Sequence, residues 1–475
     1  MMRRKMLINF LALLVVIIGC AIFIGWWSLY KPDLLVSDVT STEANPSVNN
    51  TEVIKAEIQN AGKATAKGFD VCLLDNGAPI TSKAIDKLDK GKTVNVDFTY
   101  TLLSSGHHTL EIQIDCKNHI REANEENNKA KIELDVKEAP PQITATVFKR
   151  QLGNNWHPTN YGGSSPVIHN GKIYVGGKNE YFFCLNKETG EEIWKYKVEN
   201  AGMHPGTYST PVFYKNNVYF GSTGSSFTES GGYVFSLNTE NGKLVWKYET
   251  GSDIFSITLD NGEIYALDSN GVIYRIDALT GKLIKTYKMP ERTNFASSIV
   301  IYKGKIYAIG DIPKTRLYCI DTETGSILWT FDGEKYKFSI PVIYHDKVYL
   351  DGRYCLDANK GFVIWENKEV SRGSQAFDKD LFVATVDGKF LCINAANGQT
   401  IWKQTIEPSV TSPFISNKKI YIGTTVNKVY CIDEHSGDTI AIYKTNGVIT
   451  TRPLAYNGKV YVVADDGYLY CFEEK

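Results

Sequence analysis

Two patterns of hydrophobic and polar residues follow one another along the chain. Residues 7–29 are apolar apart from Asn9 and Ser28, whereas apolar and polar residues alternate in many stretches after Pro32. Alternation with a period of two is typical of β-strands with one buried face, and clusters such as Asp75-Asn76-Gly77 are typical of tight turns. The pattern predicts one apolar helix at the start and an all-β remainder.

The apolar run has the length and the flanking residues of a membrane anchor. About 20 apolar residues cross a hydrocarbon core, basic residues stay on the cytoplasmic side, and aromatic residues favour the interface. Residues 3–5 are basic, and Trp26 and Trp27 lie at the far end of the run. We expect residues 1–6 to be a cytoplasmic tail and residues 7–29 a transmembrane helix. The protein would then be a single-pass protein of the cell membrane with most of the chain outside.

Two other readings of the N-terminus remain open. The apolar run could be a cleaved signal peptide, although the apolar region of such peptides is usually shorter. Cys20 follows Ile17-Ile18-Gly19 and so resembles the lipidated cysteine of a lipobox.

Length and charge restrict the class of protein. A chain of 475 residues exceeds the usual size of one core, so more than one domain is expected. Lys and Arg number 52 against 53 Asp and Glu, for a net charge of −1, and this balance supplies no field that would attract nucleic acid. We therefore expect no nucleic-acid partner.

Residues 32–137 contain about seven alternating segments separated by turns, which predicts an immunoglobulin-like β-sandwich. The strings IQNAGKATAKGFDVCLLDNG, LSSGHHTLEIQID and REANEENNKAKIELDV resemble the cell-adhesion-related domain, CARDB, of surface proteins. The acidic and amide-rich stretch at residues 122–128 could bind calcium, but a solvated turn is the favoured interpretation. Whether Cys72 and Cys116 pair is left open.

Residues 138–142, with two prolines, are expected to form a stiff linker.

Residues 143–475 contain a recurring unit of the length of one four-stranded propeller blade. A glycine occupies the same place in successive units, at Gly190, Gly242, Gly281, Gly325, Gly361, Gly398 and Gly437. The final unit, residues 452–475, has sequence for three strands only. Residues 144–151, which precede the first unit, resemble a fourth strand that belongs to no other unit. We expect this strand to complete the last blade of an eight-bladed β-propeller and so to remove the free sheet edges.

The strings NKETGEEIW, NTENGKLVW, DTETGSILW and NAANGQTIW resemble PQQ-like repeats, which occur in quinoprotein dehydrogenases and in the propeller of outer-membrane assembly. The resemblance implies that one repeated residue wedges adjacent blades together through its large apolar area. This position holds Trp194, Trp246, Trp329, Trp365 and Trp402. Two units lack the tryptophan, near Lys285 and Ala441, and weaker blade junctions are expected there.

Six cysteines also recur at one position of the unit, at Cys184, Cys319, Cys355, Cys392, Cys431 and Cys471. Equivalent positions on neighbouring blades are expected to lie too far apart for disulfides. We therefore interpret these residues as buried, unpaired thiols that act as small apolar residues. No metal site is expected from them.

The residues that quinoprotein dehydrogenases use are not evident. Those enzymes usually carry a Cys-Cys disulfide above the quinone, and this chain has no such dipeptide. No pair of titratable residues stands out for general acid–base work. We therefore expect no catalytic residue and no cofactor, with a PQQ-dependent dehydrogenase as the alternative.

The remaining candidate site is the face formed by the loops that enter each blade. Aromatic and arginine residues are favoured at binding sites. The loops contain Trp156, His157, Tyr161, Met203, His204, Tyr208, Phe255, Phe295, Tyr336, Arg372 and Arg452. We expect a membrane-anchored cell-surface scaffold that binds a protein, peptide or glycan on this face. A second alternative is a structural component of the envelope without a discrete ligand.

Overall fold

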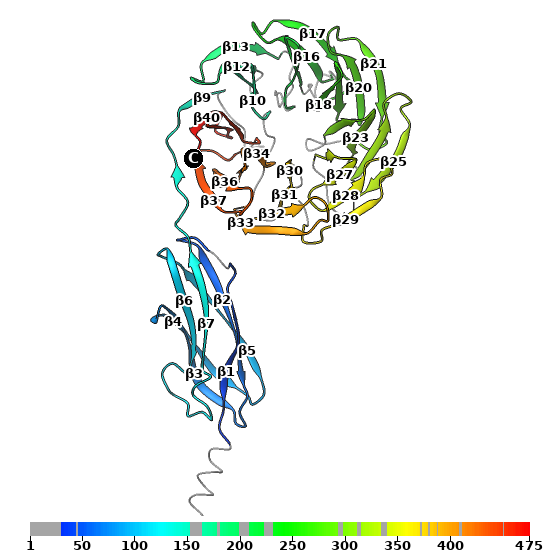
Figure 1. Ribbon diagram of the computed structural model, residues 1–475. Helices are drawn as coiled ribbons and strands as arrows, with labels where there is room; N and C mark the ends of the chain where they lie inside the picture. The colour runs from blue at the N-terminus through cyan, green and yellow to red at the C-terminus, as the bar shows by residue number, and fades with distance from the viewer. Residues whose placement is uncertain are drawn as a thin grey trace, which may run out of the picture. The chain divides into compact units, whose positions relative to one another are not determined.

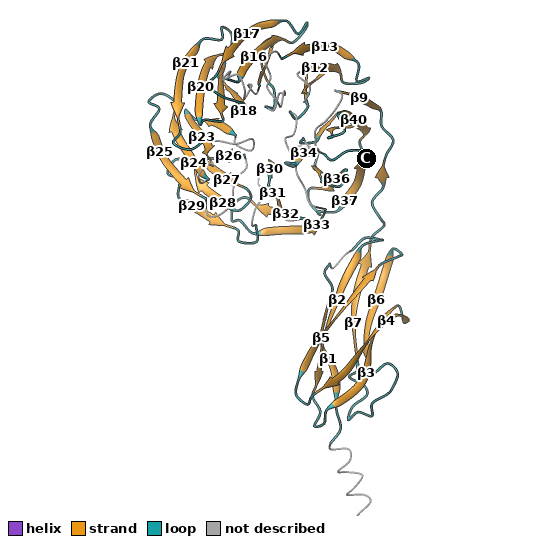
Figure 2. Cartoon of the chain, turned by 180° about the vertical axis from the view of Figure 1, so that it is seen from behind, coloured by secondary structure: helices purple, strands orange, loops and turns teal. Residues whose placement is uncertain are grey.

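The computed structural model describes residues 30–43, 46–152, 164–177, 181–198, 209–222, 231–292, 298–310, 315–333, 340–370, 373–378, 381–386, 388–407, 411–449 and 451–475. Residues 1–29, which include the expected anchor, lie outside these ranges. Strands and turns make up the part of the chain that is described, and no helix in it could span a membrane (Figure 2). The chain divides into two compact units, Met1–Pro140 and Pro141–Lys475.

The first unit is a sandwich of two antiparallel sheets. One sheet has the order β1-β2-β5 and the other β4-β3-β6-β7. The strands are β1 (Leu34–Thr40), β2 (Thr51–Asn60), β3 (Ala66–Asp75), β4 (Ala78–Leu88), β5 (Thr93–Thr101), β6 (Gly106–Ile114) and β7 (Lys129–Val136).

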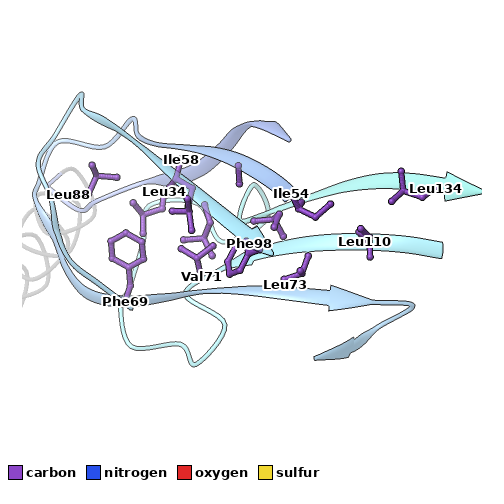
Figure 3. Packing of buried hydrophobic residues seen from close by; sticks show 14 of the residues in the cluster. Leu34, Ile54, Ile58, Phe69, Val71, Leu73, Leu88, Phe98, Leu110 and Leu134 are labelled. Atoms are coloured by element: carbon purple, nitrogen blue, oxygen red, sulfur yellow. The ribbon is translucent and has the colours of Figure 1, made fainter. Parts of the chain in front are cut away.

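The core of the sandwich forms because alternate residues of each strand point inward. Ile54, Ile58, Val71, Phe98 and Leu110 come from both sheets and meet between them (Figure 3). Their neighbours along each strand are mostly exposed. The apolar positions of the alternating sequence are thus the buried faces of these sheets, and the polar positions are their exposed faces.

Two contacts fasten the loops of the sandwich. Cys72 on β3 and Cys116 after β6 form a disulfide, which decides the pairing that the sequence left open. The Glu122 carboxylate accepts hydrogen bonds from the backbone N of Leu34, at 2.5 Å, and from Nδ2 of Asn128, at 3.0 Å. Within the described residues no three His, Cys, Asp or Glu side chains converge as metal ligands. The stretch 122–128 therefore ties the first strand of the sandwich to its last loop.

The second unit is built from antiparallel four-stranded sheets that follow one another along the chain, numbered here as sheets 1–8. Sheets 1–4 contain β10 (Val167–His169), β11 (Lys172–Gly176), β12 (Tyr181–Asn186) and β13 (Glu192–Lys197); β14 (Val212–Tyr214), β15 (Asn217–Gly221), β16 (Tyr233–Asn238) and β17 (Leu244–Glu249); β18 (Ile254–Asp260), β19 (Glu263–Asp268), β20 (Val272–Asp277) and β21 (Leu283–Lys288); β22 (Ile299–Tyr302), β23 (Lys305–Gly310), β24 (Arg316–Asp321) and β25 (Ile327–Asp332).

Sheets 5–8 continue the series. They contain β26 (Val342–Tyr344), β27 (Lys347–Leu350), β28 (Tyr354–Asp357) and β29 (Val363–Glu366); β30 (Gln375–Asp378), β31 (Leu381–Val386), β32 (Lys389–Asn394) and β33 (Thr400–Thr405); β34 (Phe414–Ser416), β35 (Lys419–Gly423), β36 (Lys428–Asp433) and β37 (Thr439–Lys444); β38 (Leu454–Tyr456), β39 (Lys459–Val463) and β40 (Tyr468–Glu473), with β9 (Phe148–Gln151) as the fourth strand of sheet 8.

The sheets are arranged in a ring, with the first strand of each sheet innermost and the fourth outermost (Figure 1). The strand expected to complete the last unit does so, because β9 pairs antiparallel with β40 from Phe148–Cys471 to Gln151–Tyr468. This pairing joins the start of the second unit to the end of the chain.

One short strand was not expected. β8 (Gln142–Ile143) pairs in parallel with β37, and Ile442 N donates a hydrogen bond of 2.9 Å to the carbonyl of Pro141. Gln142, which the sequence pattern placed in the linker, therefore belongs to sheet 7. The reason is that the outer edge of β37 offers free backbone groups to a segment that passes beside it on the way to β9.

Candidate functional site

The meander of each sheet sorts the connections onto two faces. Because successive strands are antiparallel, the loops between sheets and the loops between second and third strands share one face, here called the loop face. The tight turns, including those with the repeated glycines, lie on the other face, here called the turn face. The expected binding residues were chosen from loops between sheets and so belong to the loop face.

A ring of polar contacts marks the loop face where the chain enters the innermost strands. Arg452 N donates to Oγ of Ser165 at 3.2 Å, which links sheet 8 to sheet 1. The hydroxyls of Ser256 and Ser298 lie 3.3 Å apart between sheets 3 and 4, and Ser374 Oγ donates to the carbonyl of Thr411 at 3.0 Å between sheets 6 and 7. Polar contacts on the loop face thus join neighbouring sheets at these three junctions.

Among the expected binding residues, Arg452 is the charged one that lies in the described part of the chain. Its guanidinium carbon lies 5.4 Å from the centroid of the Phe414 ring, on the neighbouring sheet. The side chain is exposed, yet the surrounding protein removes part of its hydration, and this desolvation lowers the pKa of the guanidinium from its ordinary value. No carboxylate among the described residues forms an ion pair with it. Arg452 is therefore an exposed cation next to an aromatic ring.

The other expected binding residues divide into two groups. Phe255 lies on β18 and is only 9% exposed, so its ring belongs to the packed interior and not to an open surface. The first four residues of β18 are all buried, so both sides of the strand are covered at this point. Outside the described residues lie Trp156, His157, Tyr161, Met203, His204, Tyr208, Phe295, Tyr336 and Arg372.

Each of the five repeated tryptophans lies against a glycine of the next sheet. A Cβ on Gly242 would stand 2.6 Å from the ring of Trp194, and one on Gly361 would stand 2.6 Å from that of Trp329. The indole N–H of Trp194 also donates to the carbonyl of Thr239 at 3.1 Å. The same pair of contacts joins Trp246 to Gly281 and Ala278, Trp365 to Gly398 and Ala395, and Trp402 to Gly437 and Glu434.

A second aromatic residue of the unit reaches the same carbonyl, and sequence reasoning gave it no role. Tyr174 OH donates to the Thr239 carbonyl at 3.2 Å, beside the Trp194 indole. Tyr219, Tyr307 and Tyr349 do the same for Ala278, Ala358 and Ala395, at 2.9, 2.9 and 3.3 Å. The signal in the sequence is a tyrosine that recurs in short strings such as Lys172-Ile-Tyr-Val-Gly176. Its partner could not be identified without the position of the next sheet.

Other side chains fill the two junctions without tryptophan, and the expectation that these junctions are weaker stays a prediction. Between sheets 3 and 4, Tyr287 OH donates to the carbonyl of Thr322 at 2.7 Å. Arg275 joins Glu263, at 2.7 Å, to Glu323 of sheet 4, at 3.1 Å.

The second of these junctions lies between sheets 7 and 8. There Tyr421 OH donates to Oε1 of Glu474 at 2.7 Å, and Tyr443 OH accepts from Lys475 N at 3.0 Å. These polar contacts replace the contact between tryptophan and glycine.

The six repeated cysteines are buried and unpaired, as expected from their register. Cys184, for example, pairs across the sheet with Tyr174 on one side and Trp194 on the other. Burial raises the pKa of these thiols to about 11 or about 12. They are therefore protonated near neutral pH and poor nucleophiles.

Comparison with known proteins agrees with this architecture. The CARDB family model matches residues 31–132. The model described as outer membrane protein assembly factor BamB matches residues 149–351, 297–409, 351–439 and 392–475.

Individual relatives are distant. The chain is 24% identical to outer membrane protein assembly factor BamB of Burkholderia pseudomallei, over 66% of this chain and 84% of that protein. It is also 24% identical to tetrathionate hydrolase of Acidithiobacillus ferrooxidans, over 56% of this chain and 54% of that enzyme.

Among solved structures, BamB from Moraxella catarrhalis superposes with a TM-score of 0.54 at 15% identity, covering 70% of this chain and 98% of that one. This likeness concerns the fold. The BamB model, in contrast, matches the chain by sequence from residue 149 to residue 475, which is more than half of its length. The protein therefore belongs to the PQQ-like β-propeller family described as outer membrane protein assembly factor BamB, and carries a CARDB domain before the propeller.

Proposed function

We propose that the protein is a non-enzymatic scaffold of the cell envelope and that its eight-bladed propeller binds a protein partner on the loop face. The observation that carries the proposal is Arg452, which is exposed just before the innermost strand of sheet 8, over the ring of Phe414, and has no carboxylate partner among the described residues. Arginine next to an aromatic ring is a frequent anchor of protein interfaces. A carboxylate of the partner is the ligand that this guanidinium fits.

Two further observations support the place and the kind of partner. Most of the family's named relatives mentioned above are outer membrane protein assembly factors, and assembly requires contacts with other proteins. The disulfide between Cys72 and Cys116 is typical of a domain outside the cytoplasm. We propose that residues 7–29 anchor the chain in a membrane with both folded units on the far side.

A catalytic role has less support among the described residues. They contain no cluster of three acidic, His or Cys side chains that could hold a metal ion, and the propeller thiols are buried. An enzyme is the alternative: either a PQQ-dependent dehydrogenase or an enzyme like the relative named tetrathionate hydrolase.

The test replaces Arg452 by Glu in the full chain. The purified protein, immobilised in detergent, is exposed to envelope extract from its own source, and retained proteins are quantified by mass spectrometry. We expect one stoichiometric partner with the unchanged protein and at least about a tenfold loss with Arg452→Glu, because the charge at the centre of the interface is reversed. Lys282→Glu is the matched control, since Lys282 is exposed on the turn face.

Two results would contradict the proposal. Equal retention by Arg452→Glu and the unchanged protein would remove Arg452 from the interface. Saturable quenching of tryptophan fluorescence by PQQ with calcium, together with reduction of a dye on addition of alcohols or sugars, would make the protein a dehydrogenase.

A further inference from the structure

The outer strand of every sheet carries a branched apolar residue directly before the tryptophan position. Seven of them, all on described strands or beside them, are 40% to 49% exposed: Val147, Ile193, Val245, Ile284, Leu328, Ile364 and Ile401. The eighth, Ile440 on β37, is only partly exposed and packs against the core together with Ile143 of β8. This lower exposure of Ile440 occurs on β37, the outer strand whose edge pairs with β8.

Most outer strands also carry basic residues, which keep a free edge from pairing with other chains. Lysine or arginine occurs on β9, β13, β17, β21, β33 and β37. Among the described outer strands, β25 and β29 have none, and they belong to the adjacent sheets 4 and 5. Two neighbouring edges are thus left without this protection.

A solvent-exposed phenylalanine marks the same place. Phe362 is 53% exposed and directly follows Gly361, which lies against Trp329 of β25. In the other units this position holds Glu191, Lys243, Lys282, Ser326, Gln399 and Asp438, all polar. Ile327 and Leu328 of β25 and Val363 and Ile364 of β29 are also at least 40% exposed, and these residues together with Phe362 are here called the β25 edge. Exposed apolar clusters of this kind are typical of interaction sites.

The edge of β37 shows how a strand sits on such a sheet. There β8 runs parallel to β37, with Gln142 opposite Ile442, and the carbonyl of Pro141 accepts from Ile442 N. Thr330 holds the same register on β25, because Tyr318 faces Thr330 as Tyr430 faces Ile442. Four other outer strands, β9, β13, β17 and β33, have lysine at this position, namely Lys149, Lys195, Lys247 and Lys403.

We propose that the β25 edge binds an extended strand of a partner protein by parallel β-augmentation. The strand would present a carbonyl to Thr330 N, as Pro141 presents its carbonyl to Ile442 N on β37. It would also present an apolar residue to Leu328 and Phe362. Main-chain hydrogen bonds supply affinity in this mode, and the side-chain contacts supply specificity. The site lies on the outer rim and does not depend on Arg452 or on the proposed function of the loop face.

The test uses a fluorescent peptide with the sequence of residues 139–146, Ala-Pro-Pro-Gln-Ile-Thr-Ala-Thr, and the full chain in detergent. We expect saturable binding by fluorescence anisotropy and slower hydrogen exchange in the segment that contains Thr330. Thr330→Lys places lysine where four other edges have it, and Phe362→Gln restores the polar residue of the other units. Each should weaken binding about fivefold or more, the effect of one cross-strand contact.

The matched control is Thr286→Lys. Thr286 is exposed and holds the same register on β21, a strand that already carries Lys285 and Lys288. Its substitution should leave binding unchanged. Absence of saturable binding at millimolar peptide, or an equal loss with Thr286→Lys, would overturn the proposal. Self-association of the unchanged protein that disappears with Phe362→Gln would also overturn it, because a second copy would then be the occupant.

Discussion

At the residue scale, each blade junction concentrates several contacts on one short turn of the next sheet. The turn after β28 presents Gly361, with φ of 75°, to the ring of Trp329 and the Ala358 carbonyl to the donors of Trp329 and Tyr307. A glycine is needed there for two reasons, the positive φ and the close approach of the ring. The second reason is absent at Gly458, whose φ is 74° and whose Cβ would meet no atom within 4 Å.

The comparison of these two glycines separates backbone strain from packing. Gly458→Ala should cost about 1 kcal/mol of unfolding free energy, because only the left-handed conformation is penalised. Gly361→Ala should cost about 1–3 kcal/mol more, because the new methyl group forces Trp329 out of its position. Equilibrium unfolding in guanidinium chloride, followed by tryptophan fluorescence, measures both. Equal costs would mean that the contact between Trp329 and Gly361 adds no stability.

At the element scale, one side chain holds the start of the first strand of the sandwich. Glu122 accepts a hydrogen bond from the first backbone amide of β1, and the residue is only 3% exposed. Burial, with smaller contributions from Glu125 and Asp115, raises the pKa of Glu122 from 4.5 to about 7. The folded sandwich therefore binds a proton at this site between these two values, where the unfolded chain does not.

This difference predicts a pH dependence with a definite sign. The stabilising contribution of protonated Glu122 is complete below the unfolded pKa of 4.5 and is lost as pH rises through about 7. Between pH 5 and pH 8, the unchanged protein should lose about 2–3 kcal/mol of unfolding free energy relative to Glu122→Gln, which does not titrate. Hydrogen exchange of β1 at matched pH values measures the difference. A gap between the two proteins that does not change with pH would refute the assignment.

The strands themselves were largely predictable from the sequence, whereas some of their contacts with distant strands were not. Alternation predicted the sandwich, and the repeated unit predicted the four strands of each blade and the closing role of residues 144–151, realised by β9. β8 was not predictable, because two residues after a pair of prolines carry no periodic signal. The pairing of β8 depends on the free edge of β37, which lies some 300 residues away in the sequence. Phe255 was misplaced for a similar reason, since its exposure depends on neighbouring strands.

At the scale of the whole molecule, the two units are stabilised by different means. The sandwich has a disulfide between Cys72 and Cys116, with a sequence separation of 44, whereas the six propeller cysteines are unpaired. A crosslink of this span stabilises a domain by about 3–4 kcal/mol through the unfolded state. The propeller gains its stability from the aromatic junctions and from the closing strand β9.

Reduction should therefore act on one unit only. Adding a reductant is expected to destabilise the sandwich by about 3–4 kcal/mol and to leave the propeller unchanged. The five described tryptophans all lie in the propeller and report its unfolding, while hydrogen exchange of β3 and β6 reports the sandwich. The double variant Cys72→Ser with Cys116→Ser should reproduce the effect without reductant. A shift of the tryptophan transition on reduction would contradict this independence.

The sequence by itself determined the features that are local or repeated: the alternation of strands, the glycine turns, the register of the cysteines and tryptophans, and the two-domain order. These features recur within a few residues, where side-chain direction follows from backbone geometry alone. Tertiary structure decided which carbonyl Trp329 and Tyr307 reach, how Arg275 and Tyr287 fill a junction without tryptophan, that Cys72 pairs with Cys116, and that Phe362 remains exposed. Each of these depends on atoms far apart in the chain, whose distance only the packing of sheets sets.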